Sequence, residues 1–307
     1  MSIRARTPGR RAVLAAIAGA AAGLGPARVM AEEPILRPIP STGERVPAIG
    51  MGTWVTFNVA EDPGLVDRRL EVLRTFLAMG GAVVDSSPMY GTSEAVVGNC
   101  LARLGRPPAL FSATKVWTWL QASGPGQMAE SRRLWGVGRF DLMQVHNLLN
   151  WDGHLETLLR DKAEGRVRLI GMTTSHGGRH EEMAAIMAKQ PIDVVQFTYN
   201  IVDREAERRL LPLAAERGLA VIVNRPFRHK ELFRMFAGHP LPGWAGEIGC
   251  ANWAQFFLKF VISHPAVTCA IPATSRVDHM RENMGALSGP LPDEGMRRRM
   301  VQYVESL

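Results

Sequence analysis

The chain has 307 residues, 46% of them hydrophobic, and a formal net charge of +7. This length and composition allow one large core, so we expect one domain rather than two small ones. The excess charge lies in residues 1–31, which hold five arginines and no acid, and the remainder has 31 basic against 29 acidic residues. No basic surface of the kind that binds nucleic acid is left, and we expect no nucleic-acid partner.

The cysteines also exclude some classes of protein. Cys100, Cys250 and Cys269 are widely separated and none belongs to a CxxC pair. Such spacing is not that of a disulfide framework or a structural zinc site. We therefore expect three buried thiols that behave as small hydrophobic side chains.

The first 31 residues have the pattern of an export signal. Arg10 and Arg11 precede an uncharged run of 13 residues, 12–24, and the segment ends at Val29-Met30-Ala31, as a signal peptidase requires. The run is shorter than the roughly 20 residues that span a bilayer, so we expect no permanent membrane insertion. The segment resembles a twin-arginine signal, which implies the twin-arginine export machinery as a partner, cleavage near Ala31 and a periplasmic mature protein. A disordered or helical cytoplasmic extension is the alternative.

From residue 48 onward, short runs rich in Val and Ile alternate with amphipathic stretches of helical length. This alternation is typical of a parallel sheet wrapped in helices. It predicts an α/β fold, a (β/α)8 TIM barrel that forms a single domain over residues 32–307. The predicted strands are Ala48–Thr53, Ala82–Ser86, Leu110–Lys115, Asp141–His146, Arg168–Thr173, Val194–Tyr199, Ala220–Asn224 and Thr268–Pro272.

Two connections between these strands are informative. An apolar stripe from Leu65 to Leu77 predicts a helix after the first strand, and Gly80-Gly81 supplies positive φ angles that end it. The connection over residues 227–252 is long and rich in Gly and Pro. A connection of that length in a compact domain usually belongs to the functional site.

Polar side chains stand at the ends of otherwise apolar strands. Asp85, Lys115, His146 and Gln196 have this placement, and the carboxyl ends of barrel strands are where catalytic groups converge. Because an unpaired buried charge is costly, we expect Asp85 and Lys115 to pair.

Tyr90 follows the second predicted strand closely. A free phenol has a pKa of about 10, and a nearby ammonium group lowers it, so Lys115 is predicted to tune Tyr90. Carbonyl reduction needs a proton at oxygen as hydride reaches carbon. Tyr90 is thus the predicted proton donor, while His146 orients the carbonyl and shares the proton relay.

Three segments, residues 84–91, 114–117 and 141–146, together resemble the Asp, Tyr, Lys and His tetrad of the aldo-keto reductases. Order and approximate spacing agree over roughly residues 46–290. The resemblance implies an NAD(P)H-dependent oxidoreductase that reduces an aldehyde or ketone to an alcohol. Its implied catalytic residues are Asp85, Tyr90, Lys115 and His146.

The same resemblance implies the binding residues. Trp54 and Trp117 would be walls of a substrate pocket, which favours a carbonyl compound with apolar or aromatic bulk. Thr173 and Thr174 stand where the family has a Ser-Asn pair that holds the nicotinamide amide, and Gln196 shares that task. The segment 271–283 resembles the phosphate and adenine clamp. The other implied cofactor contacts are Thr53, Asn224, Arg225, Pro272, Thr274, Arg276 and Asn283.

The chain departs from the family pattern at two places. Asn224 occupies the position where many members stack an aromatic ring on the nicotinamide. Ala273 and His279 replace the Lys and Arg that many members direct at the cofactor 2′-phosphate. Arg276 could substitute, because a guanidinium matches phosphate oxygens well. We expect NADP(H) to be preferred over NAD(H).

Other readings of the sequence are weaker. His176 and His180 have the spacing of a metal pair, but no acidic ligand motif follows, and we expect no metal. Gly50 and Gly52 do not begin a GxGxxG motif, which disfavours the dinucleotide-binding fold. The remaining alternative is a non-catalytic nicotinamide-binding accessory or sensor subunit on the same barrel. A pure binder would have no need of the intact tetrad.

Overall fold

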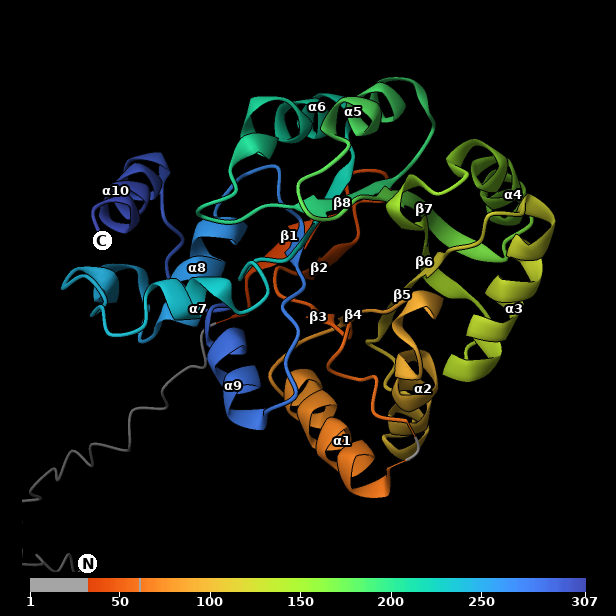
Figure 1. Cartoon of the computed structure of the whole chain (residues 1–307), viewed down its shortest axis with the longest axis horizontal. Coiled ribbons are helices and arrows are strands. Elements are labelled where there is room, and N and C mark those ends of the chain that lie inside the picture. The colour runs from red at the N-terminus through yellow and green to blue at the C-terminus, as the bar shows by residue number, and fades with distance from the viewer. Residues whose placement is uncertain (1–32, 61) are drawn as a thin grey trace, which may run out of the picture. The chain divides into compact units, whose positions relative to one another are not determined.

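The computed structural model describes residues 33–60 and 62–307. The predicted export signal lies outside these residues. Residues 33–307 form one compact unit, in which parallel strands surround a central axis and helices surround the strands (Figure 1). This arrangement confirms the predicted (β/α)8 barrel.

The barrel strands coincide with the eight predicted ones. The sheet order runs from β10 through β9, β8, β7, β6, β5 and β4 to β3. Isolated parallel bridges join Ile49 to Ala270 and Gly52 to Ala273, which closes the sheet between its first and last strands. The strands are β3 (Met51–Gly52), β4 (Val83–Asp85), β5 (Phe111–Val116), β6 (Phe140–Val145), β7 (Val167–Thr173), β8 (Val194–Thr198), β9 (Ala220–Asn224) and β10 (Cys269–Ala270).

Burial on both faces explains the apolar composition of these strands. Alternate side chains such as Phe111, Leu142 and Leu169 form a cluster inside the barrel. The side chains between them, such as Met143 and Ile170, belong to a larger cluster shared with the helices. A strand that faces a core on both sides must be apolar at nearly every position, so a polar side chain on such a strand stands out.

Helices cover the outside of the barrel, and none in the described part of the chain is long and apolar enough to cross a membrane. The first begins at the predicted place, where the Asp62 carboxylate accepts from the Leu65 backbone N–H at 3.0 Å. The helices are α1 (Pro63–Ala78), α2 (Ser93–Arg103), α3 (Gly124–Trp135), α4 (Trp151–Ala163), α5 (His180–Lys189), α6 (Leu210–Arg217), α7 (Glu231–Met235), α8 (Trp253–Ile262), α9 (Val277–Gly285) and α10 (Glu294–Glu305).

The two glycines that follow α1 have different roles. Gly80 has a φ of +88° and confirms the predicted helix end. Gly81 is not among the positive-φ residues, so that part of the prediction is wrong. A Cβ atom at Gly81 would approach the Phe76 ring to 2.2 Å. Gly81 is therefore required by close packing rather than by its backbone angles.

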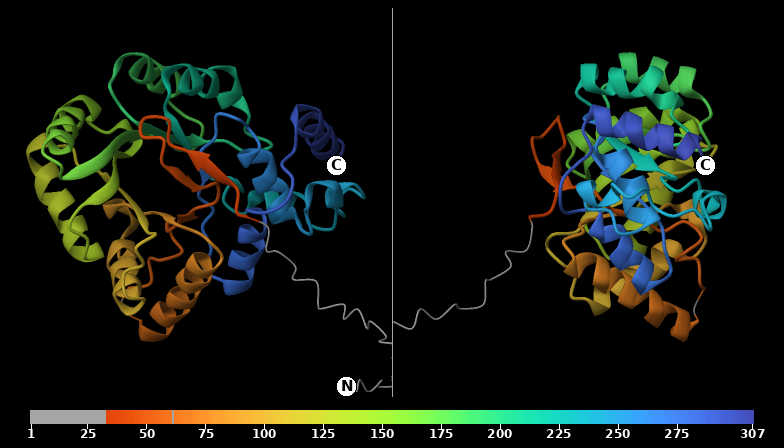
Figure 2. Two further views of the ribbon diagram at one scale, coloured as in Figure 1. Left: turned by 180° about the vertical axis from the view of Figure 1, so that it is seen from behind. Right: turned by 90° about the vertical axis from the view of Figure 1, so that its left-hand side faces the viewer.

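An antiparallel hairpin, not predicted from the sequence, precedes the barrel. It consists of β1 (Leu36–Pro38) and β2 (Arg45–Pro47). Ile39 and Val46 of this hairpin belong to the interior cluster, and Figure 2 shows the hairpin crossing one end of the barrel. Arg168 on β7 pairs with both Glu44 of the hairpin and Asp141 of β6. The hairpin thus closes the end of the barrel opposite the carboxyl ends of its strands.

The last helix is attached through one arginine. Arg297 on α10 donates to the Tyr199 hydroxyl at 2.5 Å and to the Glu207 carboxylate at 2.8 Å. Its guanidinium also lies 4.3 Å from the centre of the Phe260 ring. Arg297 is mostly buried, with 11% of its side chain exposed, whereas 64% of the neighbouring Arg298 is exposed.

We expect Arg297→Ala to lower the free energy of unfolding by about 3 kcal/mol, because it removes the cation beside a partly buried carboxylate that keeps only the Tyr199 hydroxyl as a donor. Arg298→Ala removes only an exposed i,i+4 pair with Glu294 and should cost at most about 0.5 kcal/mol. Urea unfolding of the purified proteins measures both values. Equal losses for the two variants would contradict the anchoring role of Arg297.

Candidate active site

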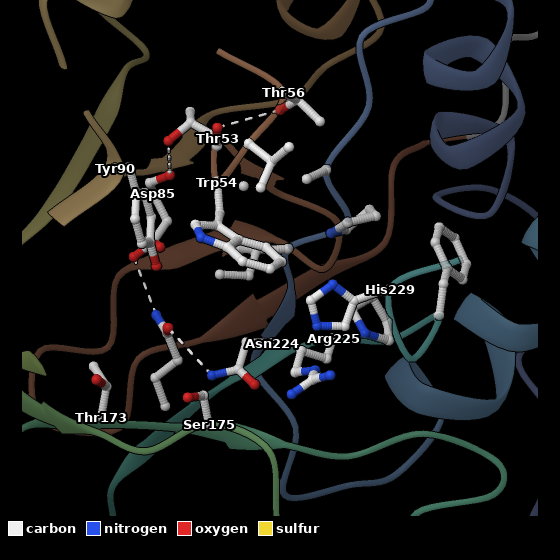
Figure 3. Close-up of a pocket in the computed structure, with 18 of the residues that line it drawn as sticks. Thr53, Trp54, Thr56, Asp85, Tyr90, Thr173, Ser175, Asn224, Arg225 and His229 are labelled. Carbon is white, nitrogen blue, oxygen red and sulfur yellow. Dashed lines mark hydrogen bonds between the residues drawn. The ribbon is translucent and has the colours of Figure 1, made fainter. Parts of the chain in front are cut away.

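A cavity of about 450 Å³ opens at the carboxyl ends of the barrel strands (Figure 3). Most of the residues predicted to bind or react come together in its lining, although they are spread over more than 200 positions of the chain. Those that line it are Thr53, Trp54, Asp85, Tyr90, His146, Thr173, Thr174, Gln196, Asn224, Arg225 and Pro272.

A buried ion pair lies beneath this cavity. Lys115 Nζ donates to Asp85 Oδ1 at 2.5 Å and to the Ser86 carbonyl at 2.7 Å, and the Lys115 side chain is fully buried. The other carboxylate oxygen of Asp85 accepts from the side-chain amides of Gln144 and Gln196, each at 3.1 Å. The predicted pairing is confirmed. Burial lowers the pKa of Lys115, but Asp85 and Tyr90 more than compensate, so the ammonium remains charged.

Tyr90 ends a short 3-10 helix (Pro88–Tyr90) next to the ion pair. Lys115 Nζ lies 5.1 Å from the centre of the Tyr90 ring. Burial raises the pKa of Tyr90, and Lys115 lowers it only in part, so the pKa lies above its ordinary value. The lysine acts in the predicted direction, but the net shift is the opposite of the one expected, because desolvation of a phenolate is the larger effect. The phenol therefore keeps its proton at neutral pH.

His146 follows β6 and faces Tyr90. The two rings meet edge to face, with centroids 5.6 Å apart. Burial, together with the positive charge of Lys115, holds the pKa of His146 well below its ordinary value. The imidazole is thus neutral near pH 7 and carries a single proton.

The threonines at the end of β7 fit the amide of a nicotinamide. Thr173 Oγ1 accepts from the Asn147 backbone N–H at 3.0 Å, which leaves its own proton available. Thr174 Oγ1 is buried and has no hydrogen-bond partner within the described residues. A buried hydroxyl without a partner is uncommon in folded proteins. An amide that both donates and accepts would satisfy it.

Asn224 places an amide group at the end of β9, where the family pattern has an aromatic ring. Its Nδ2 donates to the Thr174 carbonyl at 2.8 Å, and its Oδ1 accepts from Thr198 at 2.8 Å. Both ends of the amide are therefore engaged within the barrel. Trp54, from the loop after β3, lines the cavity and lies between Tyr90 and Asn224 in Figure 3.

Arg225 brings to the cavity a positive charge that forms no salt bridge within the described residues. Its Nε and Nη1 atoms are buried and have no hydrogen-bond partner within the described residues. Burial lowers the pKa of Arg225, and the opposing effect of Asp203 is too weak to cancel it. A phosphate group of a dinucleotide would supply the missing acceptors. Arg225 and Thr174 together show that the residues present fit a nicotinamide dinucleotide.

Four of the predicted binding residues lie outside the lining of this cavity. Trp117 does not line it: the side chain of Gln127 on α3 holds the Trp117 backbone, and the indole is 40% exposed. Arg276 lines a separate groove and pairs with Asp278. Asn283 is buried on α9. Thr274, also outside the cavity, accepts from the Arg276 backbone N–H at 3.2 Å.

The structure adds residues that the sequence did not indicate. His229, Lys230 and Arg234 line the cavity from the long connection after β9, which confirms that this connection belongs to the site. Arg69 on α1 donates to the carbonyls of Thr56 and Ser275 and so joins the loops after the first and last strands. The available signal for Arg69 was its position four residues after Leu65 and four before Leu73, on the apolar face of the predicted helix.

Comparison with known proteins agrees with this site. A sequence model of the aldo/keto reductase family matches residues 48–235. Methylglyoxal reductase YeaE of Escherichia coli is 28% identical over 257 residues, covering 79% of this chain and 86% of the relative. The NADH-specific methylglyoxal reductase of the same organism is 23% identical, covering 68% and 72%.

Among solved structures, an aldo/keto reductase from Klebsiella pneumoniae in complex with NADP and acetate has a TM-score of 0.73 at 24% identity. The superposition covers 85% of this chain and 93% of that one. The family match spans more than half of the chain and contains all four members of the tetrad. The chain is therefore a member of the aldo/keto reductase family, an enzyme whose activity is NAD(P)H-dependent reduction of carbonyl groups.

Proposed function

We propose that the protein reduces an aldehyde or ketone to an alcohol with hydride from NADP(H) and the proton of the Tyr90 hydroxyl. The observation that carries this assignment is the position of a protonated phenol at the cavity wall, directly beside a buried ammonium group. Such a group can give up its proton during reaction, because the phenolate that remains lies next to Lys115.

Each member of the tetrad then has one task. Tyr90 donates its proton to the carbonyl oxygen, and the charge of Lys115 stabilises the resulting phenolate. Asp85 keeps Lys115 charged and in place. Neutral His146 donates a hydrogen bond to the same carbonyl oxygen. A nicotinamide held in the cavity would supply hydride to the carbonyl carbon.

Unsatisfied polar atoms of Thr174 and Arg225, together with the lining of the cavity, indicate which residues would hold the cofactor. Thr173, Thr174 and Gln196 would bind the carboxamide, and Arg225 would bind the pyrophosphate. Asn224 offers no ring for stacking, so Trp54 is the available aromatic neighbour. The remaining contacts would extend along the loops after β3 and β10 and onto α9; they are Thr53, Pro272, Thr274, Arg276 and Asn283.

The cavity wall favours carbonyl compounds with an apolar part. Trp54, Met89 and Phe227 line it, whereas Trp117 would contribute only by moving toward the cavity. The Escherichia coli relatives named as methylglyoxal reductases make small 2-oxoaldehydes the first substrates to test, beside aromatic aldehydes and quinones.

We expect Tyr90→Phe to lower kcat for aldehyde reduction by roughly 10²- to 10⁴-fold, the usual contribution of a general acid, with little change in cofactor affinity. Tyr303→Phe is the matched control, because Tyr303 donates to the Pro240 carbonyl on the outer surface. Consumption of NADPH absorbance measures both variants, and cofactor fluorescence measures binding. Full activity in Tyr90→Phe would exclude Tyr90 as the proton donor.

A preference for NADP(H) is proposed on the chemistry of Arg276. Its guanidinium is now held by Asp278, and an incoming 2′-phosphate would have to compete with that carboxylate. Arg276→Ala should raise KM for NADPH severalfold and leave KM for NADH unchanged, while Asp278→Asn should lower KM for NADPH by freeing the guanidinium. Parallel titrations with both cofactors measure this. Equal changes in KM for NADPH and in KM for NADH would show that Arg276 does not recognise the 2′-phosphate.

Export to the periplasm is proposed on the sequence of residues 1–31 alone. If Arg10-Arg11 directs twin-arginine export, a double change of both to Lys should leave the full-length chain in the cytoplasm of a bacterial host. The matched control changes Arg4 and Arg6 to Lys and should keep export. Fractionation and N-terminal sequencing measure location and the cleavage site near Ala31. A wild-type chain found uncleaved in the cytoplasm would contradict the proposal.

A further inference from the structure

The Ser87 hydroxyl contacts the Nδ1 atom of the His146 imidazole. It follows β4 in an extended conformation, with φ −165° and ψ 146°, and His146 directly follows β6. The Ser87 Oγ atom and the His146 Nδ1 atom are 2.8 Å apart. Both residues are buried, with 0% and 4% of their surface exposed. Water therefore does not compete for this contact.

The direction of the hydrogen bond can be decided by following the protons. Ser87 Oγ accepts from the Met89 backbone N–H at 3.2 Å, so one of its lone pairs is in use. For the Ser87 hydroxyl proton, His146 Nδ1 is the only acceptor within hydrogen-bonding distance in the described part of the chain. A proton on Nδ1 would leave the serine proton buried and unpaired, which is unfavourable. Ser87 must therefore donate, and Nδ1 must be the unprotonated nitrogen.

We propose that Ser87 is a positioning residue that fixes the tautomer of His146, so that the single proton is on Nε2 and is offered to the carbonyl oxygen of the substrate. The proposal rests on the function assigned above. Without Ser87, the ring could carry its proton on either nitrogen. The form protonated at Nδ1 would present a lone pair, and not a donor, to the oxygen.

The surroundings of His146 make this choice consequential. Lys115 on β5 and Tyr90 on the 3-10 helix are the charged and titratable groups that face the ring, and Asp85 lies behind Lys115. Burial and Lys115 keep the pKa of His146 low. A doubly protonated ring, which could donate from both nitrogens, is thus not available near pH 7. The nitrogen that carries the single proton therefore decides whether His146 can donate a hydrogen bond to the carbonyl oxygen of the substrate.

The test combines kinetics with nitrogen NMR of protein labelled with ¹⁵N-histidine. His146→Asn identifies the His146 signals by their loss. Ser87→Ala removes the donor, and Ser87→Thr keeps a hydroxyl on an extended backbone that suits a β-branched residue. Ser93→Ala is the matched control, because Ser93 bonds to the Tyr90 carbonyl at 2.8 Å without contacting His146. The Ser93→Ala change removes a hydrogen bond from the segment that carries Tyr90 but removes no contact of the His146 imidazole.

We expect wild-type His146 to show an unprotonated Nδ1 and a protonated Nε2, and Ser87→Ala to show a mixture. Ser87→Ala should also lower kcat by about ten- to a hundredfold with KM for the cofactor unchanged. Ser87→Thr should restore both properties, and Ser93→Ala should keep the wild-type tautomer. A wild-type proton on Nδ1, or an unchanged tautomer and kcat in Ser87→Ala, would overturn the proposal. A correct tautomer in a protein that reduces no carbonyl compound would instead contradict the proposed function.

Discussion

The ion pair between Lys115 and Asp85 is almost wholly buried, with 0% and 2% of the two side chains exposed, so the polar atoms around it need partners within the protein. Asp85 takes two further donors from Gln144 and Gln196, and Lys115 takes the Ser86 carbonyl. These groups come from β4, β5, β6 and β8. A shift of any one strand by a residue would turn its polar group away and leave a charge unsatisfied. The pair therefore constrains the register of half of the barrel as well as the chemistry at its mouth.

The charge of Lys115 also affects the pKa values of two neighbouring residues, Tyr90 and His146. Lys115 opposes protonation of His146 and partly offsets the burial that raises the pKa of Tyr90. The result is a protonated phenol beside a neutral imidazole, both in contact with the cavity. Each can present one hydrogen to one oxygen atom, which is the arrangement that carbonyl reduction requires. Burial thus keeps both donors neutral, and the charge of Lys115 adds to this effect at His146 but opposes it at Tyr90.

The sequence predicted what depends on local pattern and on charge. All eight barrel strands were visible as apolar runs, and the Asp85–Lys115 pair followed from two charges at apolar strand ends. The hairpin was missed because each of its strands has three residues and ends in proline. The place of Trp117 depends on Gln127, from a helix later in the chain. The net pKa shift of Tyr90 depends on burial, which sequence does not measure.

The side chain of Arg69 joins the loops that follow β3 and β10, the two strands where the barrel closes. The cavity reaches both loops, since Thr53 and Pro272 both line it. A molecule bound there would contact both β3 and β10, the strands between which the barrel closes, and would lose its site if these strands separated. Ligand occupancy and barrel closure are then thermodynamically linked: a bound dinucleotide would stabilise the closed barrel by a free energy that grows with the logarithm of the ligand concentration.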